Sequence, residues 1–294
     1  NTSPIYSKPS KAMSYQSITF GPDMAFILAQ PAEAFTSLFK KVAMLHFIGV
    51  HRKIFGWRKR ASYSFMRCEQ YENGLFEHKV LGPVRSIEEH SQVGNVDLEE
   101  IDFDLSISGK TEEWADCLWQ DYGLNQKVVI AIAPGAIRRH KQWPIENFIT
   151  VARELRDEIS NIFIIIIGTA QDHELGNEIC KELGTSSCLN LAGDLHLTQS
   201  AALLGRCRML VANDGGAVHL ATAVGCCCVV IANEIEYPGS IEPWFSKEGA
   251  VRYHPPCAPC YSFLFCPTGE MLCVRGITPE QVLDKCRTFG LAER

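Results

Sequence analysis

Four uniformly apolar segments in the C-terminal part of the chain constrain the fold more than any other feature. They lie at residues 128–134, 161–168, 209–212 and 226–232. Segments with the apolar spacing of helices lie between and beside them. Their apolar positions are Phe148, Val151, Ala152 and Leu155, then Leu175, Ile179 and Leu183, then Ala201–Leu204, and finally residues 219–224. Strands that are apolar on both faces and alternate with helices are typical of a parallel sheet covered on both sides. The pattern therefore predicts a doubly wound α/β domain.

The N-terminal part is less regular. A strand is expected at residues 24–28 and a helix at 32–45, followed by a basic segment at 51–60 and an acidic one at 86–100. The basic segment is either a solvated loop or a surface for anionic lipid. Residues 102–110 are typical of a linker or an edge strand. We place a domain boundary here, with residues 1–115 in one domain and 116–294 in the other.

Composition narrows the class of protein. The formal charge of −6 argues against a nucleic-acid partner, and no apolar run approaches the ~18–20 residues that span a bilayer. The sequence shows no pattern of charged start, apolar stretch and small-residue cleavage site, and its start at Asn1 suggests processing or a fragment. Of 13 cysteines, seven have apolar neighbours and are expected to be small core residues: Cys68, Cys117, Cys180, Cys188, Cys207, Cys226 and Cys286. Consecutive Cys226–Cys228 suit a reducing cytoplasm better than a disulfide framework.

Three polar loops follow predicted strands, where an open parallel sheet binds its ligands. The first, PGAIRRHKQWP at 134–144, combines a glycine turn with cations and suits a phosphate, although it could be a solvated basic loop. The second, ANDGGAVH at 212–219, leaves backbone N–H groups open at a helix start, which favours an anion. There Asp214 caps the helix or sets the loop, and His219 faces either the ligand or the core. In the third, GTAQDHE at 168–174, Asp172 either holds a ribose or base or caps a helix. Thr198 is expected to cap the following helix.

Several common motifs are missing. The chain has no G-x-G-x-x-G after a strand, no G-x-x-x-x-G-K-[ST] and no G-x-S-x-G. These absences disfavour Rossmann dehydrogenases, P-loop enzymes and serine hydrolases.

The loops, taken in order, resemble glycosyltransferase family 9, the ADP-heptose:lipopolysaccharide heptosyltransferases. The matching stretches read IAPGAIRRHKQWP, IIIIGTAQDHEL, LAGDLHLTQSAALL and ANDGGAVHLATAVG, and the tail CAPCYSFLFCPTGEMLCVRGITPEQVL is similar to that of many members. The resemblance implies a GT-B fold of two Rossmann-like domains, the N-terminal one incomplete. It also implies a cytoplasmic enzyme, in possible peripheral contact with the inner membrane, that transfers heptose from an ADP-sugar to a lipopolysaccharide core acceptor.

The resemblance also implies roles for residues. Lys141 would neutralise the diphosphate, while Asp214, Gly215, Gly216 and His219 would cradle diphosphate and sugar. Asp172 and Thr198 would lie near adenosine. A cation and a helix dipole can stabilise the leaving diphosphate, so no catalytic metal is expected.

Two departures from the family pattern matter. The family's N-terminal Gly-Asp turn, whose aspartate is its proposed base, has no counterpart before Met24, so the catalytic residue is left unknown. Asn233-Glu234-Ile235-Glu236 replaces the commoner F-G-x-T, which bears on the nucleotide or sugar preference. Two other hypotheses therefore remain open, a chain that only binds a nucleoside diphosphate and a sugar-nucleotide epimerase.

The tail carries Cys257, Cys260, Cys266 and Cys273. Four thiolates at such spacing can close around a structural zinc ion. The alternatives are buried free thiols or an opportunistic disulfide.

Overall fold

The computed structural model describes residues 24–26, 53–55 and 105–291, without 237, 240, 241, 245, 246 and 263. Contacts within the chain divide it into two units, and the second contains residues 101–294. The boundary predicted between residues 115 and 116 lies inside a helix of this second unit, α4, Gly109–Asp121.

Two short strands are described in the first unit. β1, Met24–Phe26, and β2, Lys53–Phe55, pair in parallel, with Met24 opposite Lys53. β1 lies within the strand predicted at residues 24–28. β2 lies within the basic segment 51–60, where no strand was predicted. The predicted helix at 32–45 and the acidic segment at 86–100 lie outside the described residues.

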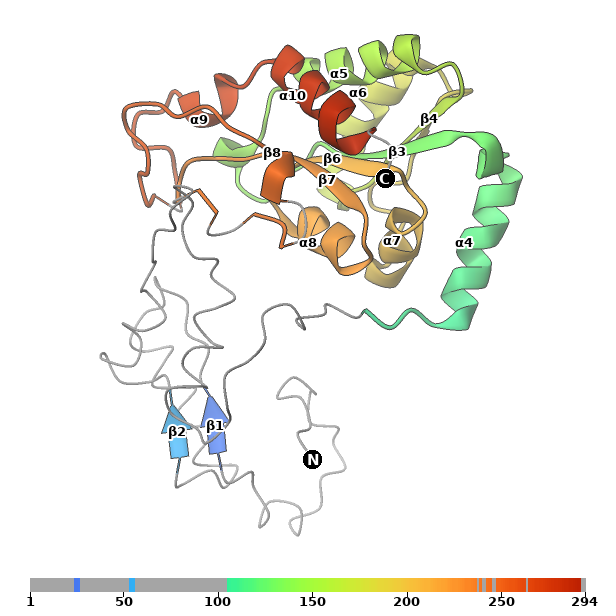
Figure 1. Ribbon diagram of the computed structural model, residues 1–294, viewed down its shortest axis with the longest axis horizontal. Helices are drawn as coiled ribbons and strands as arrows, with labels where there is room; N and C mark the ends of the chain where they lie inside the picture. The colour runs from blue at the N-terminus through green and yellow to red at the C-terminus, as the bar shows by residue number, and fades with distance from the viewer. Residues whose placement is uncertain are drawn as a thin grey trace. The chain divides into compact units, whose positions relative to one another are not determined.

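The second unit is built on a six-stranded parallel sheet (Figure 1). Its strands are β3 (Val128–Ala133), β4 (Ile162–Ile166), β5 (Cys188–Asn190), β6 (Met209–Asn213), β7 (Cys227–Ile231) and β8 (Ala250–Val251). They run side by side in the order β5-β4-β3-β6-β7-β8. In chain order this is 3-2-1-4-5-6, the arrangement of doubly wound nucleotide-binding sheets. The predicted α/β class is confirmed, and so are the four long strands.

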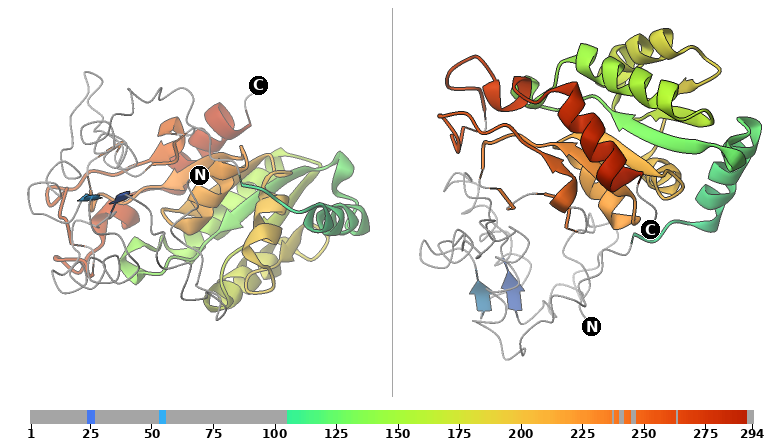
Figure 2. Two further views of the ribbon diagram at one scale, coloured as in Figure 1. Left: turned by 90° about the horizontal axis from the view of Figure 1, so that it is seen from below. Right: turned by 45° about the horizontal axis from the view of Figure 1, so that its top comes forward.

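Helices cover both faces of this sheet (Figures 1 and 2). The helices of the second unit are α4, α5 (Ile145–Glu158), α6 (His173–Leu183), α7 (Leu197–Leu204), α8 (Gly216–Ala223), α9 (Leu272–Arg275) and α10 (Pro279–Lys285). Ile130 and Ile132 of β3 pack with α5, α6 and α10, while Val129 and Ala131 pack with α4, α7 and α8. Alternate side chains of one strand therefore enter two separate cores, which is why the strands are apolar throughout.

Short helical turns fill the connections. They are the 3₁₀ turns η3 (Leu124–Gln126), η4 (Arg139–Lys141), η5 (Ala170–Asp172) and η6 (Lys247–Gly249) and the π turn η7 (Cys286–Gly290). No helix among the described residues has both the length and the apolar content that crossing a membrane requires.

The cysteines follow the expectation in part. Cys207, Cys226 and Cys286 are buried as predicted. Cys117 is exposed on α4, so its assignment to the core was wrong. Cys180 and Cys188 form a disulfide, because the end of α6 lies beside β5 and brings their Cα atoms to 5.2 Å. Cys68 lies outside the described residues.

Candidate functional site

The site lies where the order of the strands reverses. β3 and β6 are neighbours, but β3 continues into α5 on one face of the sheet and β6 into α8 on the other. The two connections diverge at the carboxyl ends of neighbouring strands, and this switch point is where such sheets bind ligands. The region between the loops 134–144 and 212–219 is called the crevice below. The first two predicted loops leave the sheet at this point.

Asn213, the last residue of β6, joins these loops. Its amide Nδ2 donates to the carbonyl oxygens of Pro134 at 2.7 Å and of Gly135 at 3.3 Å, and its Oδ1 accepts from Trp143 N at 3.0 Å. Asn213 is buried, and so is Trp143, whose indole donates to the carbonyl oxygen of Ile277. Both ends of the 134–144 loop are thereby attached to the end of β6. Sequence analysis did not single out Asn213, although a polar residue closing an apolar strand was a signal.

Lys141 and Asp214 meet across the crevice. Lys141, in η4, places its Nζ 2.8 Å from Asp214 Oδ2, and the two side chains are only 22% and 10% exposed. The same carboxylate oxygen accepts from Asn233 Nδ2 at 2.6 Å. A cation predicted to bind phosphate is therefore held in a defined position at the strand ends.

The start of α8 is open beside this ion pair. Gly215 is its N-cap residue, and no side chain caps the helix. A Cβ added at Gly216 would meet nothing within 4 Å, and one added at Gly215 only Asn213 O at 3.8 Å. Val218 N donates to Gly215 O at 3.2 Å, so the N–H groups of Gly216 and Ala217 are the ones left without a side-chain cap, as an anion site requires. His219 is exposed in the same turn, so of the two alternatives for it the core is excluded.

Asp172 is bonded within the third loop and lies against the first. Its Oδ2 accepts from both the N–H and the hydroxyl of Thr169 at 2.8 Å. Asp172 occupies the N-cap position of α6, but its side chain caps η5 instead. Its carboxylate also lies against Gly135, where an added Cβ would come within 2.0 Å of Oδ1. The carboxylate therefore packs the loop after β4 against the loop after β3.

Thr198 does not cap α7. The N-cap residue is His196, whose N–H donates to Gln199 Oε1 at 2.9 Å, and the helix begins at Leu197. The cap prediction was wrong because the extended backbone ends two residues earlier than expected. Thr198 is exposed in the first turn. The loop that precedes it is bonded to the third loop through Gly193 N and Gly168 O at 3.1 Å.

Glu234, one of the residues at the position of the F-G-x-T turn, belongs to a buried charge cluster with Arg252 and Glu242. Glu234 is 1% exposed and accepts from Arg252 at 2.5 Å and from His254 Nδ1 at 3.1 Å. Arg252 also pairs with buried Glu242. The guanidinium offsets carboxylates that would be costly to bury alone. Asn233, the residue before Glu234, contacts Asp214, so this cluster adjoins the ion pair.

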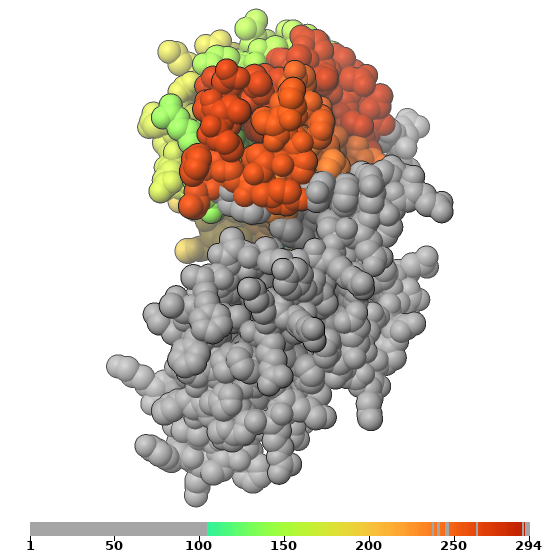
Figure 3. Space-filling view, turned by 90° about the vertical axis from the view of Figure 1, so that its left-hand side faces the viewer, coloured from blue at the N-terminus to red at the C-terminus, as the bar shows by residue number. Residues whose placement is uncertain are grey.

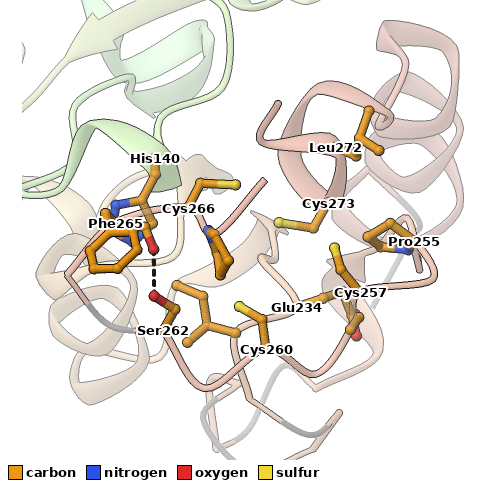
Figure 4. A pocket seen from close by; sticks show the side chains of 13 residues that line it. His140, Glu234, Pro255, Cys257, Cys260, Ser262, Phe265, Cys266, Leu272 and Cys273 are labelled. Carbon is orange, nitrogen blue, oxygen red and sulfur yellow. Dashed lines mark hydrogen bonds between the residues drawn. The ribbon is translucent and has the colours of Figure 1, made fainter. Parts of the chain in front are cut away.

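The four tail cysteines line one pocket outside the sheet (Figure 4). Burial raises the pKa of Cys273, and the neighbouring Cys260, Cys266 and Cys257 raise it further. Burial disfavours the Cys266 thiolate too, but hydrogen bonds from Thr268 and from backbone N–H groups outweigh it and lower the pKa of Cys266. Among the described residues, no three His, Cys, Asp or Glu side chains are already arranged as a metal-binding group.

His140 connects this pocket with the crevice. It lines the cysteine pocket, precedes Lys141 in η4, and has a buried Nε2 without a hydrogen-bond partner in the described part of the chain. Burial, with the nearby cations Arg138 and Lys141, lowers the pKa of His140. Figure 3 shows the tail after β8 as one surface beside the loop after β3.

The chain is similar to known heptosyltransferases. Lipopolysaccharide heptosyltransferase 2 of Escherichia coli K12 is 36% identical over 104 residues, 34% of this chain and 29% of that protein. Lipooligosaccharide heptosyltransferase 2 of Haemophilus influenzae is 27% identical over 179 residues, 55% of this chain and 47% of that protein. The chain spans less than half the length of the curated relatives it matches.

Solved structures show the same fold. A family 9 glycosyltransferase from Veillonella parvula superposes with a TM-score of 0.67 at 16% identity, covering 94% of this chain and 76% of that one. E. coli ADP-heptose lipopolysaccharide heptosyltransferase II superposes with a TM-score of 0.59 at 22% identity, covering 92% and 76%. The family model "Glycosyltransferase family 9 (heptosyltransferase)" matches residues 36–264, most of the sequence. The chain therefore belongs to glycosyltransferase family 9, the heptosyltransferases.

Proposed function

We propose that this chain binds ADP-heptose in the crevice between β3 and β6 and takes part in transfer of the heptose to a sugar of the lipopolysaccharide core. The observation that carries the proposal is the Lys141–Asp214 pair beside the open start of α8. A cation and free backbone N–H groups converge there, which is what a diphosphate requires. The names of the relatives support heptose as the sugar.

The chain's residues would divide the work as follows. Lys141 and the first N–H groups of α8 bind the diphosphate and stabilise the charge that develops as it leaves. Asp214 would repel a phosphate, so we assign it to hold Lys141 and to accept hydrogen bonds from sugar hydroxyls. The exposed His219 side chain is available to the same ligand. Asp172 and Thr198, on the loops after β4 and β5, border the adenosine side. Because Lys141 and the helix supply positive charge, the proposal includes no catalytic metal.

The reaction replaces one bond at the anomeric carbon of heptose. The acceptor hydroxyl forms a new C–O bond there, while the bond to ADP breaks and ADP leaves with the electron pair. A base must take the hydroxyl proton, and no described residue is assigned to that role. We place the reaction in the cytoplasm, with peripheral contact at the inner membrane, because the acceptor is a lipid-linked sugar.

Calorimetric binding of ADP and UDP to the full chain tests the donor site. We expect ADP to bind, UDP to bind less well, and Lys141→Ala to weaken ADP binding about tenfold to a hundredfold, because charge-assisted hydrogen bonds contribute about 1.5–3 kcal/mol. Lys110→Ala, at an exposed position on α4, is the matched control and should leave affinity unchanged. A folded chain that binds neither nucleotide, or binds ADP equally well without Lys141, would refute the assignment.

Asp214→Asn separates its two roles. The substitution removes a negative charge beside the diphosphate but keeps a side-chain oxygen that can accept from Lys141 Nζ, so ADP affinity should stay the same or rise. Affinity for ADP-heptose should fall toward that for ADP, because a hydrogen-bond acceptor for the sugar has changed. Incubation of ADP-heptose without acceptor should return the donor sugar unaltered, and an epimerised sugar would favour the epimerase hypothesis instead.

A further inference from the structure

The tail between β8 and α10 has little structure of its own. After β8 ends at Val251, the described residues contain no helix or strand until the four-residue α9 begins at Leu272. Irregular stretches longer than about 12–15 residues are uncommon in compact domains unless something else orders them. Several apolar side chains of this stretch are exposed, namely Tyr253, Tyr261, Leu264 and Phe265. Burial of apolar surface therefore does not account for the ordered path of the tail.

Four thiols from different points of this tail face one another. Cys257 lies in a turn closed by a hydrogen bond from Ala258 N to Pro255 O at 3.0 Å, and Cys260 follows this turn. Cys266 begins the next turn, and Cys273 lies on α9. Figure 4 shows their sulfur atoms turned toward the middle of the pocket. All four are free thiols. Cys257 is exposed and the others are half-buried, whereas a cysteine that serves as a small core residue is buried, as Cys228 is.

The turn after Cys266 surrounds its sulfur with donors. Met271 N donates to Cys266 Sγ at 3.4 Å, and the Thr268 hydroxyl lies at the same distance of 3.4 Å. Gly269 N donates to Cys266 O at 3.1 Å and closes the turn, with Gly269 at φ +72°. Hydrogen bonds from N–H groups to sulfur orient thiolate ligands and lower their charge at metal centres. This turn thus already has the form that a thiolate ligand needs.

We propose that Cys257, Cys260, Cys266 and Cys273 bind one divalent metal ion tetrahedrally, and that this ion holds the tail in place. Four thiolates select zinc or iron among the common metals. Binding converts four thiols to thiolates and releases four protons to water, without any change of oxidation state. Since no three of these side chains in the described part of the chain are yet arranged as a metal-binding group, binding must draw the sulfur atoms together around the ion. The site lies outside the crevice, so the proposal is independent of the donor assignment.

Metal content of the full chain, purified under reducing conditions without chelator, is the first measurement. Elemental analysis should find about one zinc or iron per chain, and it also tells the two metals apart. Cobalt substituted for the native ion should give the near-ultraviolet absorption of thiolate-to-cobalt charge transfer, with the visible bands of a tetrahedral site. A chain that holds no metal and takes up no cobalt would overturn the proposal. Disulfides between the tail cysteines, detected after alkylation of the free thiols, would overturn it as well.

Variants assign the ligands. Cys257→Ser and Cys273→Ser should each lose most of the bound metal and lower the melting temperature. Cys117→Ser, at an exposed cysteine on α4, should match the parent in both. His140→Ala should keep the metal, since His140 lines the pocket but is not a proposed ligand; loss of metal there would refute the four-thiolate assignment. If a cysteine variant fails to fold, the cobalt spectrum of the parent chain decides the question alone.

Discussion

Asn213 should be the most sensitive polar residue of the crevice. It is 2% exposed and holds both ends of the 134–144 loop through its bonds to Pro134 O and Trp143 N. Asn213→Ala removes both partners at once and leaves a buried carbonyl and a buried N–H group without hydrogen bonds. The loop that carries Lys141 then loses its attachment to the end of β6.

The magnitude follows from these two groups. An orphaned buried donor or acceptor costs about 1–3 kcal/mol, so Asn213→Ala should destabilise the second unit by about 3 kcal/mol. The longer bond to Gly135 O, at 3.3 Å, is weak and does not alter this figure. With a urea m-value of about 1–3 kcal/mol/M, the unfolding midpoint should fall by about 1 M or more. ADP affinity should fall as well, because Lys141 is no longer held opposite Asp214.

Urea unfolding followed by tryptophan fluorescence gives the measurement, with Asn161→Ala as control. Asn161 makes one exposed side-chain hydrogen bond, to Gln126 O at 2.9 Å. Its loss should change stability by no more than about 0.5 kcal/mol. The reasoning is refuted if Asn213→Ala is no more destabilising than Asn161→Ala at an unchanged m-value, since the loop would then be held by something else.

Two further predictions concern packing and pH. Gly249→Ala should lower the melting temperature strongly, because the new Cβ would lie 1.9 Å from the carbonyl oxygen of Cys228. Gly109→Ala is the control and should not lower it, since its Cβ would meet no atom within 4 Å. Equal melting temperatures of the two variants would contradict this prediction. A hydrogen bond from Arg287 lowers the pKa of Glu158 from its ordinary 4.5. A carboxyl whose pKa is lowered by folding stabilises the fold at pH values above its unfolded-state pKa. The parent should therefore be more stable than Arg287→Met at pH 7, and this difference in stability should shrink as pH falls through and below 4.5. A stability difference that does not change with pH would show that the Glu158–Arg287 pair does not cause it.

The central strands were predictable because each is buried on both faces. β3 and β7 had to be apolar at every position, and a run of five or six such residues cannot be mistaken for an exposed loop. The same burial separates Cys227, in one core, from Cys226 and Cys228 in the other. Parallel order followed from the helices in between, since parallel strands require crossovers.

The elements that were missed are those with little burial to mark them. β5 and β8, at the two edges of the sheet, have only three and two residues and produce no apolar run. α4 buries only Ala115 and Trp119, so its helical period is hidden among polar residues. The sequence marks this helix only through its N-cap residue, Ser108, whose Oγ accepts from Thr111 N at 3.3 Å.

The candidate site was predicted as loops but not as an arrangement. Composition located Lys141 and Asp214 on loops that follow strands, yet these residues are 73 positions apart and their 2.8 Å contact depends on β3 and β6 being neighbours. That adjacency exists because the chain adds β4 and β5 on one side of β3 and then crosses back to place β6 on the other. The role of Asn213 depends on the same strand order. Its amide bonds to the loop after β3, and no local sequence pattern connects that loop with the end of β6. A sequence with the same loops on a sheet of different strand order would keep the glycines and the cation, but it would lose the point at which they converge.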